Sequence, residues 1–285
     1  MSDAASNRAA GNAIATAAED VISAYDESLV PSLFGPWAAV LLDALKVTLG
    51  DHVLDVATGP GTVARPAAVR AGRTGRVVAC DISPAMLEVG RRKPAEEGAA
   101  PISWVESPAA PLAGPLASAD GRFDVVTCQQ GLQFFPDRPA ALAEMRRALR
   151  PGGRLGVSVW GHQSDSPGFA ALGAAVREML GDEVADRYAG GPWGMPETTA
   201  LAALLDATGF AQAQVSARRL RVIFPGGSAQ LIRSIVVAPI AADVVALPPE
   251  RRAALVSAAE QRLAPMITNG VLSFETVANI GLATR

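Results

Sequence analysis

Five short apolar runs alternate with helix-forming segments between residues 50 and 161, and this alternation restricts the possible folds more than any other feature of the sequence. Each run is apolar almost throughout rather than at every second position, which is typical of strands that are buried on both faces. Parallel strands covered by helices have this pattern, so we expect an α/β fold with a doubly wound sheet. The predicted strands are Val53–Val56, Arg76–Asp81, Ile102–Val105, Phe123–Cys128 and Arg154–Trp160.

Two further strands are expected after this block, near residues 213–224 and 272–284, with helical segments before and between them. We expect a single domain over residues 1–285, with an N-terminal helical cap at 1–50 and a cofactor-binding core at 51–161. Lid helices and the last two strands would occupy 162–285. Residues 1–20 are small and polar, and we expect them to be disordered or loosely helical.

The composition argues against several classes of partner. The chain has 25 basic and 28 acidic residues, a net charge of −3 and no basic stripe, so we expect no nucleic-acid partner. With two cysteines (Cys80 and Cys128), two histidines and no CxxC motif, we expect reduced thiols and no metal site. No secretory signal is evident, and the longest apolar run, 235–242, is far short of the roughly 20 residues that cross a bilayer. We therefore expect a cytoplasmic protein with no membrane partner.

A glycine loop follows the first predicted strand. Its sequence from Gly59 to Ala64 fits the pattern GxGxxA, and Asp81 lies 20 residues beyond Gly61, at the end of the second strand. This spacing matches the dinucleotide fingerprint, in which the acidic side chain accepts hydrogen bonds from ribose hydroxyls. An NAD(P)-dependent oxidoreductase is therefore one interpretation of the loop.

Asp55 favours a different ligand. Its carboxylate lies four residues before Gly59, where it would repel a pyrophosphate and attract a cation. The loop also has two residues between the strand end and the first glycine, which is longer than the dinucleotide pattern. An adenosine that carries an amino acid and a sulfonium in place of phosphates suits this arrangement, and that ligand is S-adenosylmethionine.

Three segments in order resemble the class I S-adenosylmethionine-dependent methyltransferases. VLDVATGPG at 53–61 is similar to their first motif, and VVACDISPAMLEVGRR at 77–92 to their acidic second-strand segment. Residues 123–160, from FDVVTCQQGLQFFPD to GGRLGVSVW, resemble the block from the fourth to the fifth strand in the ubiquinone/menaquinone-biosynthesis-like branch. The resemblance implies a seven-stranded Rossmann-like methyltransferase sheet whose last strand is antiparallel.

The same resemblance implies a set of cofactor contacts. The first loop would hold the methionine moiety, the acidic residue of the second strand the ribose, and two apolar side chains after it the adenine. A serine–proline pair stands where the family usually has aspartate–alanine, so a neutral hydroxyl would accept from the adenine amino group. The implied cofactor residues are Asp55, Ala57, Gly59, Gly61, Asp81, Ile82, Met86, Ser107, Pro108 and Gln129.

The candidate acceptor residues are less constrained by pattern. His162 follows the fifth strand and has a pKa range suited to a general base, with an exposed loop histidine as the alternative. Gln133 follows the fourth strand and would be a pocket residue or a local cap. Tyr25, Phe34 and Trp37 would contact substrate or form part of a lid, or simply pack in the core.

We therefore expect transfer of a methyl group from S-adenosylmethionine to a small apolar or aromatic acceptor, in secondary metabolism, with S-adenosylhomocysteine as the product. The methyl group is already activated, so the protein aligns it with the nucleophile and excludes water. A base is needed only if the acceptor must lose a proton. The alternatives are the NAD(P)-dependent oxidoreductase and a non-catalytic S-adenosylmethionine-binding module. The sequence leaves open the acceptor, the atom methylated and the oligomeric state, a homodimer included.

Overall fold

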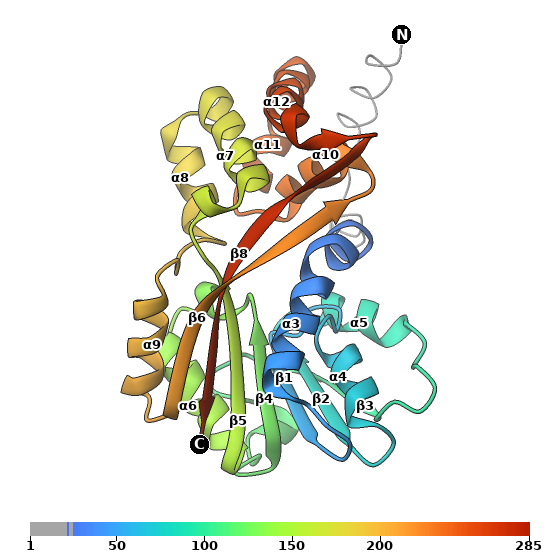
Figure 1. Ribbon diagram of the computed structural model, residues 1–285, viewed down its shortest axis with the longest axis vertical. Coiled ribbons are helices and arrows are strands. Elements are labelled where there is room, and N and C mark those ends of the chain that lie inside the picture. The colour runs from blue at the N-terminus through green and yellow to red at the C-terminus, as the bar shows by residue number, and fades with distance from the viewer. Residues whose placement is uncertain (1–21, 23–24) are drawn as a thin grey trace. The chain divides into compact units, whose positions relative to one another are not determined.

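The computed structural model describes Ile22 and residues 25–285, and all seven predicted strands are present in it (Figure 1). Residues 1–20, expected to be disordered or loosely helical, lie outside the described residues. Of the predicted cap at 1–50, the structure describes Ile22 and residues 25–50. The strands are β1 (His52–Val56), β2 (Arg76–Asp81), β3 (Ile102–Glu106), β4 (Phe123–Gln129), β5 (Leu149–Trp160), β6 (Ala211–Phe224) and β8 (Val271–Thr284).

The strands form one mixed sheet in the order β3-β2-β1-β4-β5-β8-β6. Neighbours from β3 to β5 are parallel, whereas β8 runs antiparallel to β5, with Arg154 opposite Thr284 and Trp160 opposite Ala278. The predicted methyltransferase topology, with an antiparallel last strand, is therefore confirmed. A short strand that the sequence analysis missed, β7 (Ile267–Thr268), pairs with β8 across an Asn-Gly turn, a strong hairpin signal.

The described residues group into two compact units. Unit 2 contains residues 35–161, 195–218 and 278–285, and unit 1 contains the described part of 1–34 together with 162–194 and 219–277. The long strands β6 and β8 contribute residues to both units. The 35–161 segment of unit 2 ends at Gly161, which is the predicted end of the cofactor-binding core. The expectation of a single domain stays a prediction.

Unit 2 holds the parallel strands and the helices that cover them. Right-handed crossovers place α4 and α5 on one face of the sheet, together with α3, and α6 on the other face with α9 (Figure 1). Ser83 and Asp137 cap α5 and α6, accepting from the amides of Met86 (3.3 Å) and Ala140 (2.9 Å). The helices are α3 (Gly35–Leu45), α4 (Ala64–Ala71), α5 (Pro84–Arg92), α6 (Arg138–Ala148) and α9 (Thr198–Ala207), with short 3₁₀ turns η2 (Gly114–Leu116) and η3 (Leu132–Phe134).

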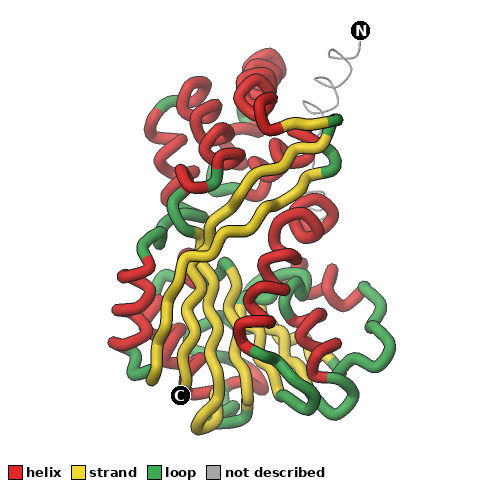
Figure 2. Tube along the Cα trace, in the orientation of Figure 1, coloured by secondary structure: helices red, strands yellow, loops and turns green. Residues whose placement is uncertain are grey.

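Unit 1 is mainly helical (Figure 2), and its aromatic side chains pack against one another. Phe169 contacts Trp193 and Phe274 at ring-centroid distances of 5.4 and 5.7 Å, and Phe224 stacks on Phe274 at 5.7 Å. Its elements are η1 (Tyr25–Phe34), η4 (Gln163–Asp165), α7 (Pro167–Leu180), α8 (Asp182–Gly190), α10 (Gly227–Ile232), η5 (Arg233–Val237), α11 (Ala241–Val245), α12 (Pro249–Leu263) and η6 (Ala264–Met266).

One helical stretch has the length and apolar composition of a membrane span. It runs over Tyr25–Leu45, through η1 and α3, and half of its most apolar window is buried. Trp37, Leu41 and Leu42 of this stretch are fully buried, and α3 packs on β4 and β5. The apolar face of α3 is thus accounted for by the core of unit 2.

Candidate cofactor and acceptor site

Asp55 lies beneath the first loop at the end of β1 and is 1% exposed. One carboxylate oxygen accepts from the Thr58 hydroxyl at 2.6 Å, and the other from the Thr127 hydroxyl of β4 at 2.7 Å. Burial raises the pKa of this carboxyl from 3.8 to about 6, although the two hydroxyl bonds and the Ala64 amide oppose the rise. Asp55 therefore ties the loop to the neighbouring strand, and its charge would act on a ligand through space.

The backbone of the first loop bends sharply at Ala57, Gly59 and Gly61, which all have positive φ (57°, 57° and 84°). The two glycines serve different purposes. A Cβ on Gly61 would lie 2.5 Å from the indole of Trp104, so the loop packs there without room for a side chain. A Cβ on Gly59 would meet nothing within 4 Å, so the loop is open at that residue. Gly59 is therefore the position where a ligand can approach the backbone.

Asp81 at the end of β2 connects the first two loops. One carboxylate oxygen accepts from the Gly59 amide at 2.8 Å, and the other from the Ser83 amide at 2.9 Å. An ionised carboxylate has about four acceptor positions, so these two bonds leave capacity for ribose hydroxyls. Asp81 thus lies beside the open side of the glycine loop, as its predicted role requires.

Two apolar side chains follow Asp81, as expected for an adenine contact. Ile82 is 71% exposed, which is unusual for a large aliphatic side chain, and Met86 is half-buried on the first turn of α5. An exposed isoleucine directly after Asp81, the carboxylate predicted to bind ribose, offers an apolar surface for a flat base.

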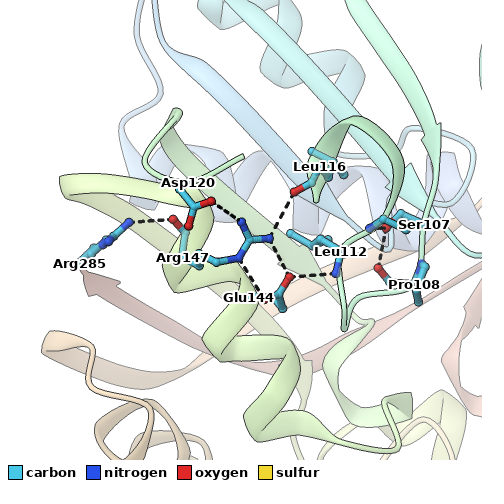
Figure 3. Close-up of polar contacts among 9 residues, drawn as sticks. Ser107, Pro108, Leu112, Leu116, Asp120, Glu144, Arg147 and Arg285 are labelled. Carbon is cyan, nitrogen blue, oxygen red and sulfur yellow. Dashed lines mark hydrogen bonds and ion pairs between the residues drawn. The ribbon is translucent and has the colours of Figure 1, made fainter. Parts of the chain in front are cut away.

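The loop after β3 carries the predicted adenine-side pair, Ser107 and Pro108. The Ser107 hydroxyl donates to the Pro108 carbonyl at 2.8 Å and accepts from the Ala113 amide at 2.9 Å, so it mainly shapes its own loop. An ion-pair cluster on α6 anchors the same loop (Figure 3): Glu144 accepts from the Leu112 amide at 2.9 Å, and Arg147 pairs with Glu144 at 2.8 Å. Arg147 also donates to the Leu116 carbonyl and pairs with Asp120 at 2.9 Å.

The loop after β4 is built from buried amides. Gln129, Gln130 and Gln133 are 9%, 8% and 4% exposed. Gln133 donates through Nε2 to Gln130 Oε1 at 3.2 Å, and Gln130 donates through Nε2 to the Ser158 hydroxyl of β5 at 3.1 Å. Gln130 has a positive φ of 54°, and its backbone amide donates to the Ser158 carbonyl at 2.8 Å. We call Gln133, Gln130 and Ser158 the amide relay.

This second loop contacts the first. A Cβ on Gly131 would lie 2.7 Å from the Ala57 Cβ, so the two backbones meet where only glycine fits. The cofactor loop and the amide relay therefore share the carboxyl edge of the parallel strands, where α/β folds bind their ligands.

The remaining predicted residues are divided between the two units. Trp37 is fully buried in unit 2 and contacts Trp160 edge to face at 6.0 Å, which is a core contact rather than an exposed surface. In unit 1, Tyr25 stacks on Phe34 at 4.9 Å within η1, and both are half-buried. His162 is the first residue of the 162–194 segment of unit 1 and is exposed, and its role as general base stays a prediction.

Sequence reasoning missed the partners that hold the site together: Thr58, Thr127, Gln130 and Ser158. A signal for two of them was present, because Thr127 and Ser158 interrupt otherwise apolar strand runs, and buried polar side chains need partners. The two cysteines, in contrast, are buried and not joined in a disulfide, and burial raises the pKa of both thiols.

Comparison with known proteins decides the family. The model of the ubiE/COQ5 methyltransferase family matches residues 14–216, well over half of the chain. The chain belongs to the ubiE/COQ5 methyltransferase family. It is therefore an S-adenosylmethionine-dependent methyltransferase, and the open Gly59, the Asp81 carboxylate and the exposed Ile82 fit that cofactor.

Curated relatives of this methyltransferase differ in the atom they methylate. The ubiquinone/menaquinone biosynthesis C-methyltransferase UbiE of Cupriavidus pinatubonensis is 33% identical over 61% of this chain and 72% of that protein. Nocamycin O-methyltransferase of Saccharothrix syringae is 40% identical, over 47% of this chain and only 46% of that protein. The chain thus spans about half to three-quarters of the length of these relatives.

A solved structure supports the fold of this methyltransferase. Phosphoethanolamine N-methyltransferase 2 of Haemonchus contortus, in complex with phosphomonomethylethanolamine and S-adenosylhomocysteine, superposes with a TM-score of 0.59 at 17% identity. The superposition covers 94% of this chain and 57% of the other. At this identity the likeness concerns the fold alone.

Proposed function

We propose that this methyltransferase acts on a small, neutral, apolar or aromatic acceptor at the carboxyl edge of the sheet. The observation that carries the proposal is the chemistry of the loop after β4, where residues 129–135 contain three glutamines, two phenylalanines and no ionisable side chain. Uncharged amides beside aromatic side chains suit a neutral acceptor better than a phosphorylated or strongly charged one.

The chain's own residues would divide the work of the reaction. S-adenosylmethionine, when bound, supplies an electrophilic methyl group on a sulfonium. Asp81 would hold the ribose, and the buried charge of Asp55 would favour the cationic donor over its neutral-sulfur product. Amide side chains bind polar groups of an acceptor without removing a proton, so the loop after β4 would align the nucleophile. His162 is the proposed base if the acceptor must be deprotonated.

The names of the relatives support a small-molecule acceptor and leave the methylated atom open. One is a C-methyltransferase of ubiquinone/menaquinone biosynthesis and the other an O-methyltransferase for nocamycin. We extend to this chain only their shared feature, a small organic acceptor. A cytoplasmic location, a role in secondary metabolism and a homodimer remain part of the proposal.

A transfer assay with methyl-labelled S-adenosylmethionine tests the proposal. The enzyme is incubated with a panel of hydroquinones, naphthols and phenolic acids, and label is counted in the organic extract alongside S-adenosylhomocysteine formation. We expect transfer to uncharged members of the panel and none in Asp81→Ala, with Asp206→Ala, an exposed carboxylate on α9, as the matched control. Transfer confined to charged acceptors would contradict the proposal.

A thermal-shift series independently tests the alternative interpretation, an NAD(P)-dependent oxidoreductase. A ligand at about 100 times its dissociation constant stabilises a protein by about 2.7 kcal/mol. We expect S-adenosylhomocysteine and S-adenosylmethionine to raise the melting temperature by roughly 5 to 10 °C, and NADH to leave it unchanged. A shift with NADH alone would mean that the glycine loop binds a dinucleotide.

A further inference from the structure

The amide relay ends in an atom without a partner. Gln133 Oε1 has less than 1 Å² of exposed surface and accepts no hydrogen bond from any described residue. A buried acceptor that is left unpaired destabilises a protein, so native structures rarely keep one without a reason. The partner group is therefore expected to come from a ligand.

In the relay, the Gln133 amide presents its oxygen as the free end. Its nitrogen donates to Gln130 Oε1, and the Gln130 nitrogen donates to the Ser158 hydroxyl. Gln130 keeps this arrangement although its positive φ of 54° is unfavourable for a residue with a Cβ. Strain of this kind persists where surrounding bonds impose it, and it gathers at functional sites.

The location of the relay indicates which ligand it meets. Gln133 lies in η3, directly after β4, and the adjoining Gly131 touches Ala57 of the cofactor loop. The described contacts of the cofactor side, those of Asp55, Asp81 and Ser107, do not include Gln133. The unpaired oxygen is therefore next to the cofactor loop but outside its bonding network.

We propose that Gln133 is a specificity-determining residue that accepts a hydrogen bond from a hydroxyl group of an aromatic acceptor, and that Gln130 and Ser158 position it. This inference rests on the proposed function. An amide oxygen is a neutral acceptor and does not take the proton, so Gln133 selects and orients the hydroxyl but is not the base. Because the oxygen is sealed from water, the acceptor must displace the side chains that cover it.

A pair of probes that differ only in the donor tests the assignment. The affinities of 1-naphthol and 1-methoxynaphthalene are measured by fluorescence titration in the presence of saturating S-adenosylhomocysteine. The wild-type protein should bind 1-naphthol about tenfold more tightly, because the ether leaves the Gln133 oxygen unpaired. An amide that presented its nitrogen instead could donate to either probe and would show no such preference.

The matched variants are Gln133→Met, which keeps the length of the side chain without its polar atoms, and Gln214→Met on the exposed part of β6. Gln133→Met should bring the ratio of affinities close to one and leave the affinity for S-adenosylhomocysteine within about twofold. Gln214→Met should keep the tenfold ratio. Ser158→Ala removes the hydroxyl at the far end of the relay and should reduce the ratio of the two probe affinities to about threefold. This variant tests the inference if Gln133→Met does not fold.

The inference would be overturned by equal affinity of the wild-type protein for the two probes, by no binding of 1-naphthol, or by an unchanged ratio in both relay variants. A loss of S-adenosylhomocysteine affinity in Gln133→Met as large as that in Asp81→Ala would also overturn it, because Gln133 would then serve the cofactor. The proposed function fails separately, through the absence of methyl transfer to uncharged acceptors. The probe ratio measures binding and is independent of that result.

Discussion

The loops after β1 and β4 meet at the same edge of the sheet but are built from opposite chemistry. The first is organised by carboxylates: Asp55 below it, and Asp81 beside it. The second is organised by neutral amides that end on the Ser158 hydroxyl. A charged loop is suited to a cationic methyl donor, whereas a neutral loop can bind an uncharged acceptor without competing for that donor. Under the proposed function, the two substrates would be separated by charge as well as by position.

This contrast predicts its largest effect at Asp81. Replacement by alanine removes the bonds to Gly59 and Ser83 together with the proposed ribose contacts, and bonds to a charged group contribute about 1.5 to 3 kcal/mol each. We expect S-adenosylhomocysteine affinity to fall by about 100-fold or more in a calorimetric titration. Asp206→Ala should bind normally. Unchanged affinity in Asp81→Ala would remove the ribose assignment.

The two glycines of the first loop should separate folding from binding. Gly61→Ala places a Cβ against Trp104 at positive φ and should lower the free energy of unfolding by about 2 to 4 kcal/mol. Gly59→Ala has open space, so it should lower stability by only about 1 kcal/mol but reduce cofactor affinity by about tenfold. Urea unfolding and calorimetry measure the two effects. A Gly61→Ala variant that stayed stable but lost cofactor affinity would contradict this assignment of the two glycines.

The pH dependence of stability should report the buried charge of Asp55. Its folded pKa, about 6, is higher than the unfolded value of 3.8, so the folded state binds more protons between these values. Stability from this group is therefore fully present below about pH 4 and decreases as the pH rises through 6, by at most about 3 kcal/mol. We expect Asp55→Asn to lack this component. The free energy of unfolding of both proteins is measured by denaturant titration between pH 4 and 7. If the pKa of Asp55 were unshifted, the two plots of this free energy against pH would be parallel.

The smallest expected effect concerns Ala57, the residue with a Cβ at a positive φ in the first loop. Ala57→Gly relieves about 1 to 2 kcal/mol of backbone strain but increases the freedom of the unfolded chain by about 0.5 to 1 kcal/mol. The net result should be a stabilisation of no more than about 1.5 kcal/mol, measurable as a higher urea midpoint. A clear destabilisation would show that the Ala57 methyl group contributes packing that exceeds its strain.

Local patterns were sufficient for the sheet and for the residues of the first loop. The apolar runs located all seven predicted strands, since a strand buried on both faces leaves little freedom in its composition. The boundary of β5 was less accurate: the strand begins at Leu149 rather than Arg154, because Leu149 pairs with Phe123 across an irregularity that contains the Pro-Gly-Gly segment. Ser83 and Asp137, which cap α5 and α6, are residue types that favour the starts of helices.

The sequence by itself determined the order of strands and helices, the glycine loop with its two acidic partners, and the family resemblance, because each depends on residues close together in the chain. Only the tertiary structure decided that Asp55 is bonded by Thr58 and Thr127, that Gly61 packs while Gly59 stays open, and that Gln130 links Gln133 to Ser158. The contacts of Asp55 with Thr127, of Gly61 with Trp104 and of Gln130 with Ser158 join residues far apart in the sequence. Hydrogen bonds between side chains on neighbouring strands depend on strand register and on burial. Neither can be predicted from the residue spacing within a single motif.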